Sequence, residues 1–550
     1  MPASSNLVRI RIEPLSVELD LPRGASLVPG LAAQGVEFPC GGTGECSGCQ
    51  VRVLSGSLPI TEADSAALTP DQLAQGWRLA CQARADEPLV LECGQWHMEI
   101  LADATSPSKS APCPILSESS IEDSKWVGVQ PASRSRDLAI AIDLGTTTIA
   151  TQLIDAASGD VLGVETALNP QAAFGSDVMS RIRAALEGQD LTTPIRAALG
   201  QLVARLAARL APDRASQITE VLLVGNTVMH HLFCGLDVEP LSHVPFQSPH
   251  LAEQRLTPRD LDWDLNSDCV IRFARCIGGF VGSDIRAGIV ATGIAQSPNL
   301  IALVDLGTNG EIAIGNRHGI VCASTAAGPA FEAGSIRMGM RAVTGAIAYV
   351  SLDEGTLRPT VIGDVAPRGI CGSGLVDAVA AGLRSGAILS NGRIADKSKI
   401  FPIAPPVVLY QSDIRELQLA KGAIAAGFRL LLKRLATTGA KGTGFSPYIK
   451  QSEKKEGALA PEAQQALRAI HLAGAFGNYV QIDSALRIGL LEAPHSIIHA
   501  AGNTALRGAK MLLLADEPQL PPIEHVSLAA DPAFQDEFAN CMTFPEPHNL

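Results

Sequence analysis

The sequence predicts a multidomain α/β protein in which a small N-terminal domain precedes two related lobes. A chain of 550 residues is long enough for roughly three to four domains of about 150 residues each. Its 46% hydrophobic content, with only 4% aromatic residues and 51 glycines, favours closely packed α/β layers over an aromatic-rich β-sandwich. A cluster of cysteines marks the first domain, and a strand–turn–strand phrase that occurs twice, about 160 residues apart, indicates the two lobes.

The charge and hydropathy of the chain argue against two classes of partner. A net charge of −13 at pH 7 disfavours nucleic acid, which selects basic surfaces. The opening Met-Pro-Ala-Ser-Ser-Asn leads into a strand-like pattern without the charged and then apolar segments of a signal peptide. The sequence contains no uninterrupted apolar run of roughly 18 residues, so we expect no membrane span and a cytoplasmic protein.

Four cysteines have the spacing of an iron–sulfur ligand set. Cys40, Cys46 and Cys49 are separated by five and then two residues, and Cys81 follows further along the chain. Plant-type [2Fe–2S] proteins use four and then two residues with a distant fourth cysteine, so this spacing is a close variant. A zinc site usually pairs two short Cys-x-x-Cys knuckles, and a disulfide framework is unusual in a long chain without a secretory signal. The pattern therefore predicts a [2Fe–2S] cluster held by the four thiolates.

Short elements surround the cysteine loop in the order of a β-grasp ferredoxin domain, which we place at residues 1–103. The expected elements are a β-hairpin at 7–21, a helix at 26–34, a strand at 50–54, a short helix at 70–75 and a last strand at 89–92. The segment 104–137 is rich in Ser, Pro, Lys and Asp, which is typical of a linker. A plain tether and an ordered interaction arm are both compatible with this composition.

The repeated phrase consists of an apolar strand, the residues Asp-Leu-Gly-Thr, a turn and a second strand. Glycine lets the backbone approach a phosphate closely, and threonine hydroxyls and turn amides can donate to phosphate oxygens. Aspartates at the strand ends suit Mg²⁺, which keeps several of its waters. Two such hairpins in separate lobes predict a nucleotide site. The first hairpin supplies Asp143, Gly145, Thr146 and Thr147, and the second supplies Asp305, Gly307, Thr308, Asn309 and Gly310.

A third glycine-rich phrase follows a late strand and suits a pocket in which the backbone passes under adenine. It consists of Gly474, Ala475, Phe476 and Gly477. Asp305 and Glu311 are the candidate catalytic residues, with Glu311 in the role of orienting a water. We place the first lobe at 138–296 and the second at 297–550, with an exposed insertion near 440–462.

Other conspicuous residues are better explained by packing than by chemistry. His230 and His231 lack a third metal ligand, so we expect them to pack in the core or at the surface. Cys371 lacks an identifiable base, so we interpret it as structural.

The glycine turns at 326–334 and 368–377 are expected to run into helices, where contact with phosphate and close helix packing explain them equally well.

Taken in order, these motifs resemble a known superfamily. Two Asp-x-Gly-Thr hairpins followed by Gly-Ala-Phe-Gly resemble the acetate/sugar kinase–Hsp70–actin (ASKHA) fold. With an N-terminal [2Fe–2S] domain they resemble the reductive activators of corrinoid-dependent enzymes. Further family-like phrases are Asn-Pro-Gln at 169–171, Val-Gly-Asn-Thr-Val-Met at 224–229, Ala-Gly-Pro-Ala-Phe-Glu at 327–332 and Ile-Cys-Gly-Ser-Gly-Leu at 370–375.

The resemblance implies that the cluster passes one electron to Co(II) of a corrinoid protein in a methyltransferase system and that ATP is consumed. Plant-type clusters lie near −400 mV, and Co(I) is a stronger reductant still, so the transfer runs uphill. Each 100 mV of deficit costs about 2.3 kcal/mol per electron, which gives ATP a role. The resemblance further implies an upstream donor such as a ferredoxin, flavodoxin or reductase, and leaves a homodimer open.

Three other functions remain open at this point. One alternative is an activator of another low-potential enzyme, of the 2-hydroxyacyl-CoA dehydratase type. Those activators usually bridge a [4Fe–4S] cluster between subunits. A second alternative is a redox-sensing or chaperone-like binding protein that uses the ATPase fold as a switch. A small-molecule kinase is disfavoured by the fused ferredoxin domain.

Overall fold

The computed structural model describes most of the chain. The described residues are 7–13, 17–33, 44, 49–93, 137–175, 177–210, 212–307, 309–438, 467–477, 479–515 and 519–546. The linker predicted up to residue 136 and the insertion predicted near 440–462 lie outside these ranges. Within the described ranges, no helix has the length and apolar character needed to cross a membrane.

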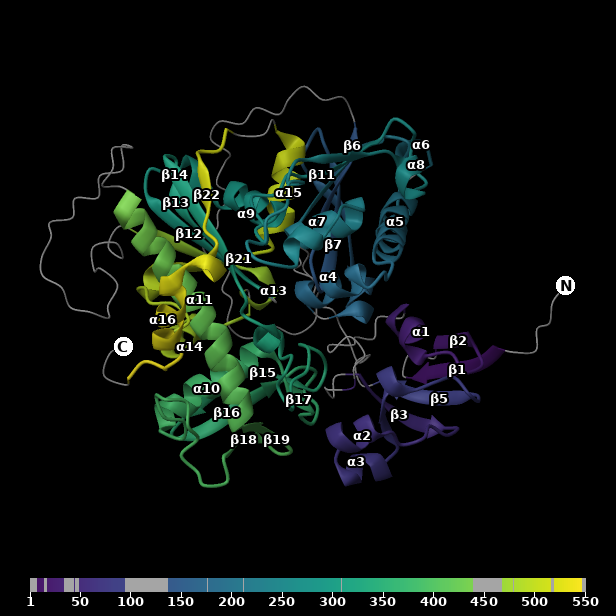
Figure 1. Ribbon diagram of the computed structural model, residues 1–550, viewed down its shortest axis with the longest axis vertical. Helices are drawn as coiled ribbons and strands as arrows, with labels where there is room; N and C mark the ends of the chain where they lie inside the picture. The colour runs from purple at the N-terminus through teal and green to yellow at the C-terminus, as the bar shows by residue number, and fades with distance from the viewer. Residues whose placement is uncertain are drawn as a thin grey trace, which may run out of the picture.

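The N-terminal domain is a five-stranded sheet with the strand order β2-β1-β5-β3-β4 (Figure 1). Its central pair, β1 and β5, is parallel, whereas β1 pairs with β2 and β3 pairs with β4 and β5 in antiparallel fashion. Alternate residues of β1 are buried, and Ile10 and Ile12 pack with Leu31 in the core beneath the sheet. The strands are β1 (Leu7–Glu13), β2 (Val17–Pro22), β3 (Gln50–Ser55), β4 (Trp77–Leu79) and β5 (Leu89–Cys93).

The described residues of this domain form three α-helices, and the sequence predicted two of them. Helix α1 (Leu27–Ala33) and helix α3 (Pro70–Ala74) lie where the sequence predicted them. Helix α2 (Glu62–Ala67) was missed, although Thr61 and Asp64 form a capping box at its start. Strand β4 was missed too, because three residues are too few to show an alternating pattern.

The first lobe is built on a six-stranded sheet in the order β10-β11-β9-β6-β7-β8. The first hairpin strand β6 lies centrally, antiparallel to β7 and parallel to β9. The elements are β6 (Leu138–Leu144), β7 (Thr148–Asp155), β8 (Val161–Leu168), α4 (Val178–Leu186), α5 (Thr192–Ala208), α6 (Pro212–Ala215), β9 (Ile218–Gly225), α7 (Thr227–Cys234), β10 (Gln254–Leu256), α8 (Pro258–Leu261) and β11 (Val270–Phe273). Helix α5 is amphipathic, with Ile195, Leu199 and Leu202 buried on one face.

The second lobe repeats five strands of this arrangement, with the order β21-β20-β12-β13-β14-β22. The sixth strand differs, because β22 pairs in parallel with β14, whereas β10 of the first lobe pairs in antiparallel fashion with β11 at the opposite edge. Strand β12 takes the place of β6, antiparallel to β13 and parallel to β20. The strands are β12 (Leu300–Leu306), β13 (Gly310–Asn316), β14 (Gly319–Thr325), β20 (Leu467–Ala473), β21 (Ile498–Gly502) and β22 (Ile523–His525). The shared strand order explains why one sequence phrase occurs twice, since each copy forms the first hairpin of its own sheet.

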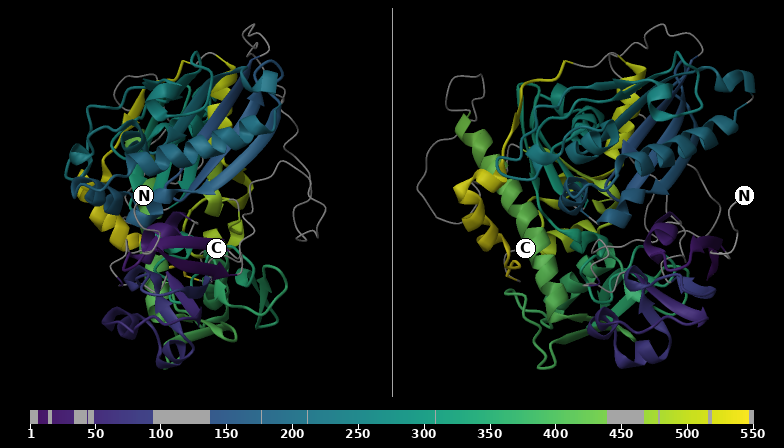
Figure 2. Two further views of the ribbon diagram at one scale, coloured as in Figure 1. Left: turned by 90° about the vertical axis from the view of Figure 1, so that its right-hand side faces the viewer. Right: turned by 45° about the vertical axis from the view of Figure 1, so that its right-hand side comes forward.

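Two helices lie between the sheets and join the lobes. Helix α9 (Ser283–Thr292) and helix α15 (Thr504–Leu514) pack against each other in the middle of the molecule (Figures 1 and 2). They can approach closely because Gly508 has no Cβ; a Cβ there would overlap the backbone of Ala287. Helix α15 also contacts β6, and helix α9 also contacts β12, so each helix of the pair contacts the sheet of the other lobe.

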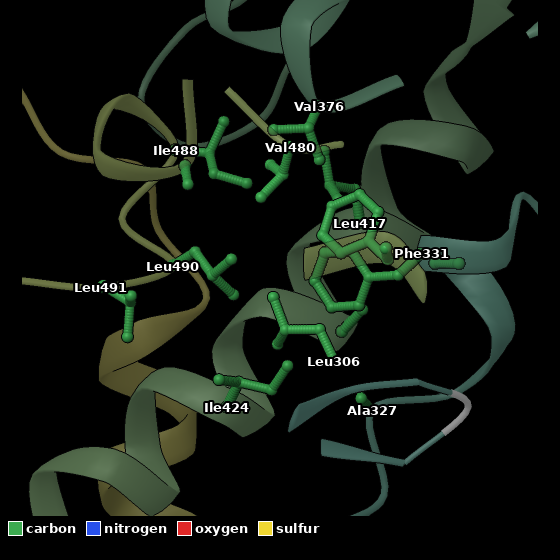
Figure 3. Packing of buried hydrophobic residues seen from close by; sticks show 14 of the residues in the cluster. Leu306, Ala327, Phe331, Val376, Leu417, Ile424, Val480, Ile488, Leu490 and Leu491 are labelled. Carbon is green, nitrogen blue, oxygen red and sulfur yellow. The ribbon is translucent and has the colours of Figure 1, made fainter. Parts of the chain in front are cut away.

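The remainder of the second lobe encloses the largest hydrophobic core. Figure 3 shows Phe331, Leu306 and Ile424 meeting at its centre, with Leu417 and Val480 beside them. The surrounding elements are β15 (Ala346–Asp353), β16 (Thr356–Val361), β17 (Gly369–Ile370), α10 (Gly372–Ser385), β18 (Ile400–Ala404), β19 (Val407–Tyr410), α11 (Gln411–Thr438), α13 (Gly474–Gly477), α14 (Ile482–Arg487) and α16 (Pro532–Cys541).

The two glycine turns that were expected to run into helices behave differently. Gly372 begins the 14-residue helix α10, as predicted. The turn at 326–334 instead forms only a short 3-10 helix, η6 (Pro329–Glu332), so the prediction of a helix there was wrong. The chain reverses directly afterwards because Ala333 adopts a left-handed φ of 59°.

Candidate functional site

Gly44, the described residue between Cys40 and Cys46, lies against the turn that carries Cys81. Gly44, between the first two cysteines, has a left-handed φ of +83°, and a Cβ there would lie 2.9 Å from Ala63 Cβ and 3.0 Å from Gln82 Nε2. Gln82 Nε2 in turn donates to Cys81 Sγ at 3.6 Å. Cys49 is buried and Cys81 is half-buried. The described part of the loop therefore fits a cluster ligand set, whereas Cys40 and Cys46 lie outside the described residues.

A buried aspartate holds the Cys81 turn in place. Asp64 accepts hydrogen bonds from the backbone N–H and the hydroxyl of Thr61, both at 2.7 Å. Its other oxygen accepts from the buried Leu79 N–H at 2.7 Å. The Asp64 side chain is only 1% exposed, so it fixes helix α2 to the strand that leads into Cys81.

The first hairpin is held by two asparagines from elsewhere in the lobe. Gly145 forms a tight turn in which a Cβ would lie 2.5 Å from Thr148 O. Asn169 Nδ2 donates to Gly145 O at 2.9 Å, and the Asn169 N–H donates to Thr147 O at 2.8 Å. Asn226 Nδ2 donates to Thr146 Oγ1 at 2.9 Å while its own oxygen caps helix α7. The turn is thus preorganised with its backbone and hydroxyls fixed.

The second hairpin places two carboxylates side by side and leaves open space above a glycine. Asp305 and Glu311 face each other across the β12–β13 ladder, and Ser324 Oγ donates to Glu311 Oε1 at 3.2 Å. A Cβ at Gly307 would meet only Asn309 O, at 3.7 Å, so protein packing alone does not require glycine there. This is the room that a phosphate needs to approach the backbone. Thr308 lies outside the described residues.

The two hairpins bring four acidic side chains into one electrostatic group. Burial raises the pKa of Asp143 to about 6, opposed by a 2.7 Å hydrogen bond from Asn503 Nδ2. Burial and then Asp143 raise the pKa of Asp305 to about 7, and burial followed by Asp305 raises that of Asp284 to about 8. Burial and then Asp284 raise the pKa of Glu311 well above its ordinary value. Such a group favours a bound cation, which would stabilise the ionised carboxylates.

The predicted adenine phrase begins at a glycine with a left-handed backbone conformation beside Asp305. Gly474 has a φ of +83°, and a Cβ there would lie 2.5 Å from Asp305 Oδ1 and 2.6 Å from Leu306 O. Two residues later, the Phe476 ring lies 4.7 Å from that of Phe331, with 30° between the planes. The phrase 474–477 therefore lies against the second hairpin, at the carboxyl end of β20.

Sequence reasoning missed four polar residues that complete the site. Asn226 and Asn503 bond to the first hairpin, Asp284 begins helix α9, and Glu332 approaches Thr147 from the second lobe. None of them belongs to a hairpin motif. Glu332 lies in the glycine turn at 326–334, for which the sequence left phosphate contact and close helix packing as equal alternatives.

The residues that we assigned to packing are confirmed as core. His230 and His231 are both fully buried, and the His230 ring lies 4.9 Å from that of Phe273. His231 Nε2 lies 2.6 Å from Ser248 Oγ. Burial and then His231 lower the pKa of His230 to about 4, so His230 is neutral at physiological pH. Cys371 is buried at the start of α10, 3.3 Å from Ser373 Oγ.

A ferredoxin-type domain joined to two lobes that share five strands in the same order defines a class, namely iron–sulfur proteins with an ASKHA nucleotide-binding domain. Three family models match the chain in this order. A 2Fe-2S iron-sulfur cluster binding domain matches residues 10–86, the RACo middle region matches 138–297, and the C-terminal ASKHA domain of RACo matches 299–441 and 459–549. The chain belongs to the family of reductive activators of corrinoid proteins.

Individual relatives agree with this assignment. The corrinoid activation enzyme RamQ of Eubacterium limosum is 34% identical over 435 residues, which are 72% of this chain and 69% of that protein. The Co(II) methylated amine-specific corrinoid protein reductase of Methanosarcina barkeri is 26% identical over 412 residues, 68% of this chain and 69% of that protein. A solved reductive activator for corrinoid,iron-sulfur protein superposes with a TM-score of 0.61 at 26% identity, covering 98% of both chains.

Proposed function

We propose that this protein is an ATP-dependent reductive activator that passes one electron from a [2Fe–2S] cluster to Co(II) of a corrinoid protein, restoring Co(I) for methyl transfer. The observation that carries the proposal is the presence, in one chain, of a ferredoxin-type cysteine site and a paired-hairpin nucleotide site. Its relatives are named for activating or reducing corrinoid proteins, which supports a corrinoid protein as the partner.

The hairpins supply the groups that would hold the phosphates of ATP. The fixed backbone turns at Gly145 and Gly307 and the hydroxyls of Thr146 and Thr147 can donate to phosphate oxygens. Among the described residues, no set of three or more His, Cys, Asp or Glu side chains is arranged to enclose a metal ion. We infer that Asp143 and Asp305 bind Mg²⁺ through its waters, which is the usual preference of this ion. Mg²⁺ would neutralise the charge of the phosphates and of the carboxylates.

The structure offers a route from nucleotide to electron carrier. Asn169, which bonds to the first hairpin, also caps the 3-10 helix η3 (Pro170–Phe174) by accepting from the Gln171 N–H at 2.9 Å. Helix η3 lies against α1, the helix that leads into the cysteine loop. Closure of the lobes around ATP would therefore act on the surface on which the ferredoxin domain rests. A nucleotide can drive such a change only by binding one state more tightly than the other.

The remaining partners are inferred from chemistry. The cluster must be reduced again after each transfer, so we propose a low-potential ferredoxin, flavodoxin or reductase as the upstream donor. A cytoplasmic location fits such donors and the absence of a membrane-spanning helix in the described residues.

A reconstituted reduction assay tests the proposal. The protein is reduced chemically, mixed with a Co(II) corrinoid protein, and the Co(I) absorbance is recorded with ATP, with ADP and without nucleotide. We expect Co(I) only with ATP. Cys81→Ser should abolish reduction while retaining ATP binding, and Asp305→Asn should abolish ATP-dependent reduction while retaining the cluster. Equal reduction without nucleotide would contradict the ATP step. Electron paramagnetic resonance distinguishes a [2Fe–2S] cluster from the [4Fe–4S] type.

A further inference from the structure

A carboxylate of the second lobe reaches across to the first hairpin. Thr147 Oγ1 lies 3.4 Å from Glu332 Oε2 and 3.5 Å from Glu332 Oε1, although the two residues are 185 positions apart in the chain. Hydroxyl–carboxylate hydrogen bonds are normally 2.5–3.0 Å long, so this is a loose contact that a better acceptor can replace. Thr147 belongs to the hairpin that is proposed to hold phosphate, and phosphate oxygen is such an acceptor.

The backbone after Glu332 is held in an unfavourable conformation. Ala333 and Ser335 have φ values of 59° and 61°, in the left-handed region that non-glycine residues rarely adopt. Such strain persists only where the surrounding structure enforces it. Gly334, between them, packs with its Cα against Pro329, where a Cβ would be 2.6 Å from the proline Cβ. The tight turn fixes the position of Glu332 at the end of η6.

A buried arginine of the first lobe is attracted electrostatically to Glu332. Arg181 of helix α4 is fully buried, donates from Nε to Gly175 O at 3.0 Å and from Nη1 to Gln171 Oε1 at 3.4 Å. Its second terminal nitrogen, Nη2, is buried without a hydrogen-bond partner in the described structure. Burial lowers the pKa of Arg181 to about 9, opposed by attraction to Asp177 and Glu332, so the guanidinium stays charged at neutral pH.

We propose that Glu332 is a catalytic residue that orients the attacking water in ATP hydrolysis, with Arg181 as a positioning residue that supports its charge. The inference rests on the proposed function, because it requires ATP as the substrate. When a phosphate oxygen replaces Glu332 as the acceptor of the Thr147 hydroxyl hydrogen bond, the Glu332 oxygen that faced Thr147 can accept a hydrogen bond from a water. That water lies next to the phosphate bound by Thr147.

The chemistry of the step balances without any further reactant. The oriented water attacks the γ-phosphorus and forms a new P–O bond, while the bond from that phosphorus to the β,γ-bridging oxygen breaks. ADP leaves with the bonding electron pair, and the proton of the water ends on inorganic phosphate. Glu332 accepts a hydrogen bond from the water and thereby fixes its direction. Glu311 is less suited to this role, because it lies 8% exposed beneath the second hairpin and already accepts from Ser324.

Steady-state hydrolysis and direct ATP binding by variants of the full-length, cluster-loaded protein test this assignment. Glu332→Gln keeps the size of the side chain and should lower kcat about 10- to 100-fold, because a neutral amide accepts the hydrogen bond of the water more weakly than an ionised carboxylate. We expect the dissociation constant for ATP to change less than about threefold, which separates catalysis from binding. The exposed Glu354→Gln, in the β15–β16 turn, is the matched control and should behave as the parent protein.

Two further measurements separate a chemical role from a structural one. Formate should restore part of the lost kcat of Glu332→Ala but none of that of Asp305→Ala, because a small carboxylate can replace the missing acceptor. Arg181→Lys should keep more activity than Arg181→Met. A parent-like kcat in Glu332→Gln, with the parent hydrolysing ATP, would overturn this inference alone. Absence of ATP hydrolysis in the parent with its corrinoid partner would instead contradict the proposed function.

Discussion

Replacing Gly474 by alanine tests whether the 474–477 phrase positions the second hairpin. The residue has a φ of +83°, so alanine costs about 1–2 kcal/mol from backbone strain alone. The added Cβ would also lie 2.6 Å from Leu306 O and 2.5 Å from Asp305 Oδ1. Because Leu306 O belongs to a buried central strand, we expect a further 1–3 kcal/mol or so of overpacking and a displaced Asp305 carboxylate.

Gly293→Ala is the matched control for this substitution. Gly293 has a φ of +69° at the end of helix α9, and a Cβ there would meet nothing within 4 Å. It should therefore lose only the strain energy of about 1–2 kcal/mol and keep its affinity for ATP. Gly474→Ala should lose more stability in thermal denaturation and bind ATP at least tenfold more weakly by calorimetry, a change of about 1.4 kcal/mol. Equal ATP affinities for the two variants would refute the reasoning.

Three further predictions concern pH, the Cys81 turn and the cluster. The folded pKa of Asp284, about 8, exceeds its ordinary value of 3.8. The contribution of Asp284 to the free energy of unfolding is therefore complete below pH 4 and is lost as pH rises towards 8. Asp284→Asn should therefore flatten the fall in Tm between pH 5 and 8 in buffer without nucleotide or Mg²⁺; an unchanged slope would count against the acidic group. Asp64→Ala leaves the buried Leu79 N–H unpaired and should cost about 3 kcal/mol in denaturant unfolding, with less loss in Asp64→Asn. Cys49→Ser should remove the visible absorbance of the cluster without changing the dissociation constant for ATP, and retention of the full absorbance would remove Cys49 from the ligand set.

The sequence predicted the parts of the fold that are determined by residues close together in the chain. The Asp143 and Asp305 hairpins are continuous phrases, so their strands and turns follow from local alternation and glycine position. Helix α5 has apolar residues at helical spacing over 17 residues, which is long enough to identify a helix. Strand β4 has only three residues and depends on pairing with β3, so no local pattern marks it.

The parts of the site that sequence could not predict are contacts between distant segments. Asn503 bonds to Asp143 across 360 positions, and an asparagine before a helix gives only the signal of an N-cap. Glu332 gives no signal of its own beyond a glycine turn, since its role depends on Thr147 in the other lobe. The capping box at Thr61 and Asp64 was a readable local signal for helix α2, and the additional bond from Leu79 to Asp64 emerges only in the folded domain.

The most direct test of the account is a single-turnover experiment followed by electron paramagnetic resonance. The protein is reduced, freed of excess reductant and mixed with a Co(II) corrinoid protein, with or without ATP. The account predicts that, with ATP, one reduced-cluster signal disappears for each Co(II) signal lost, and that both signals persist without it. Loss of the Co(II) signal while the cluster stays reduced, or equal loss without ATP, would contradict the claim that nucleotide binding drives electron delivery from the cluster.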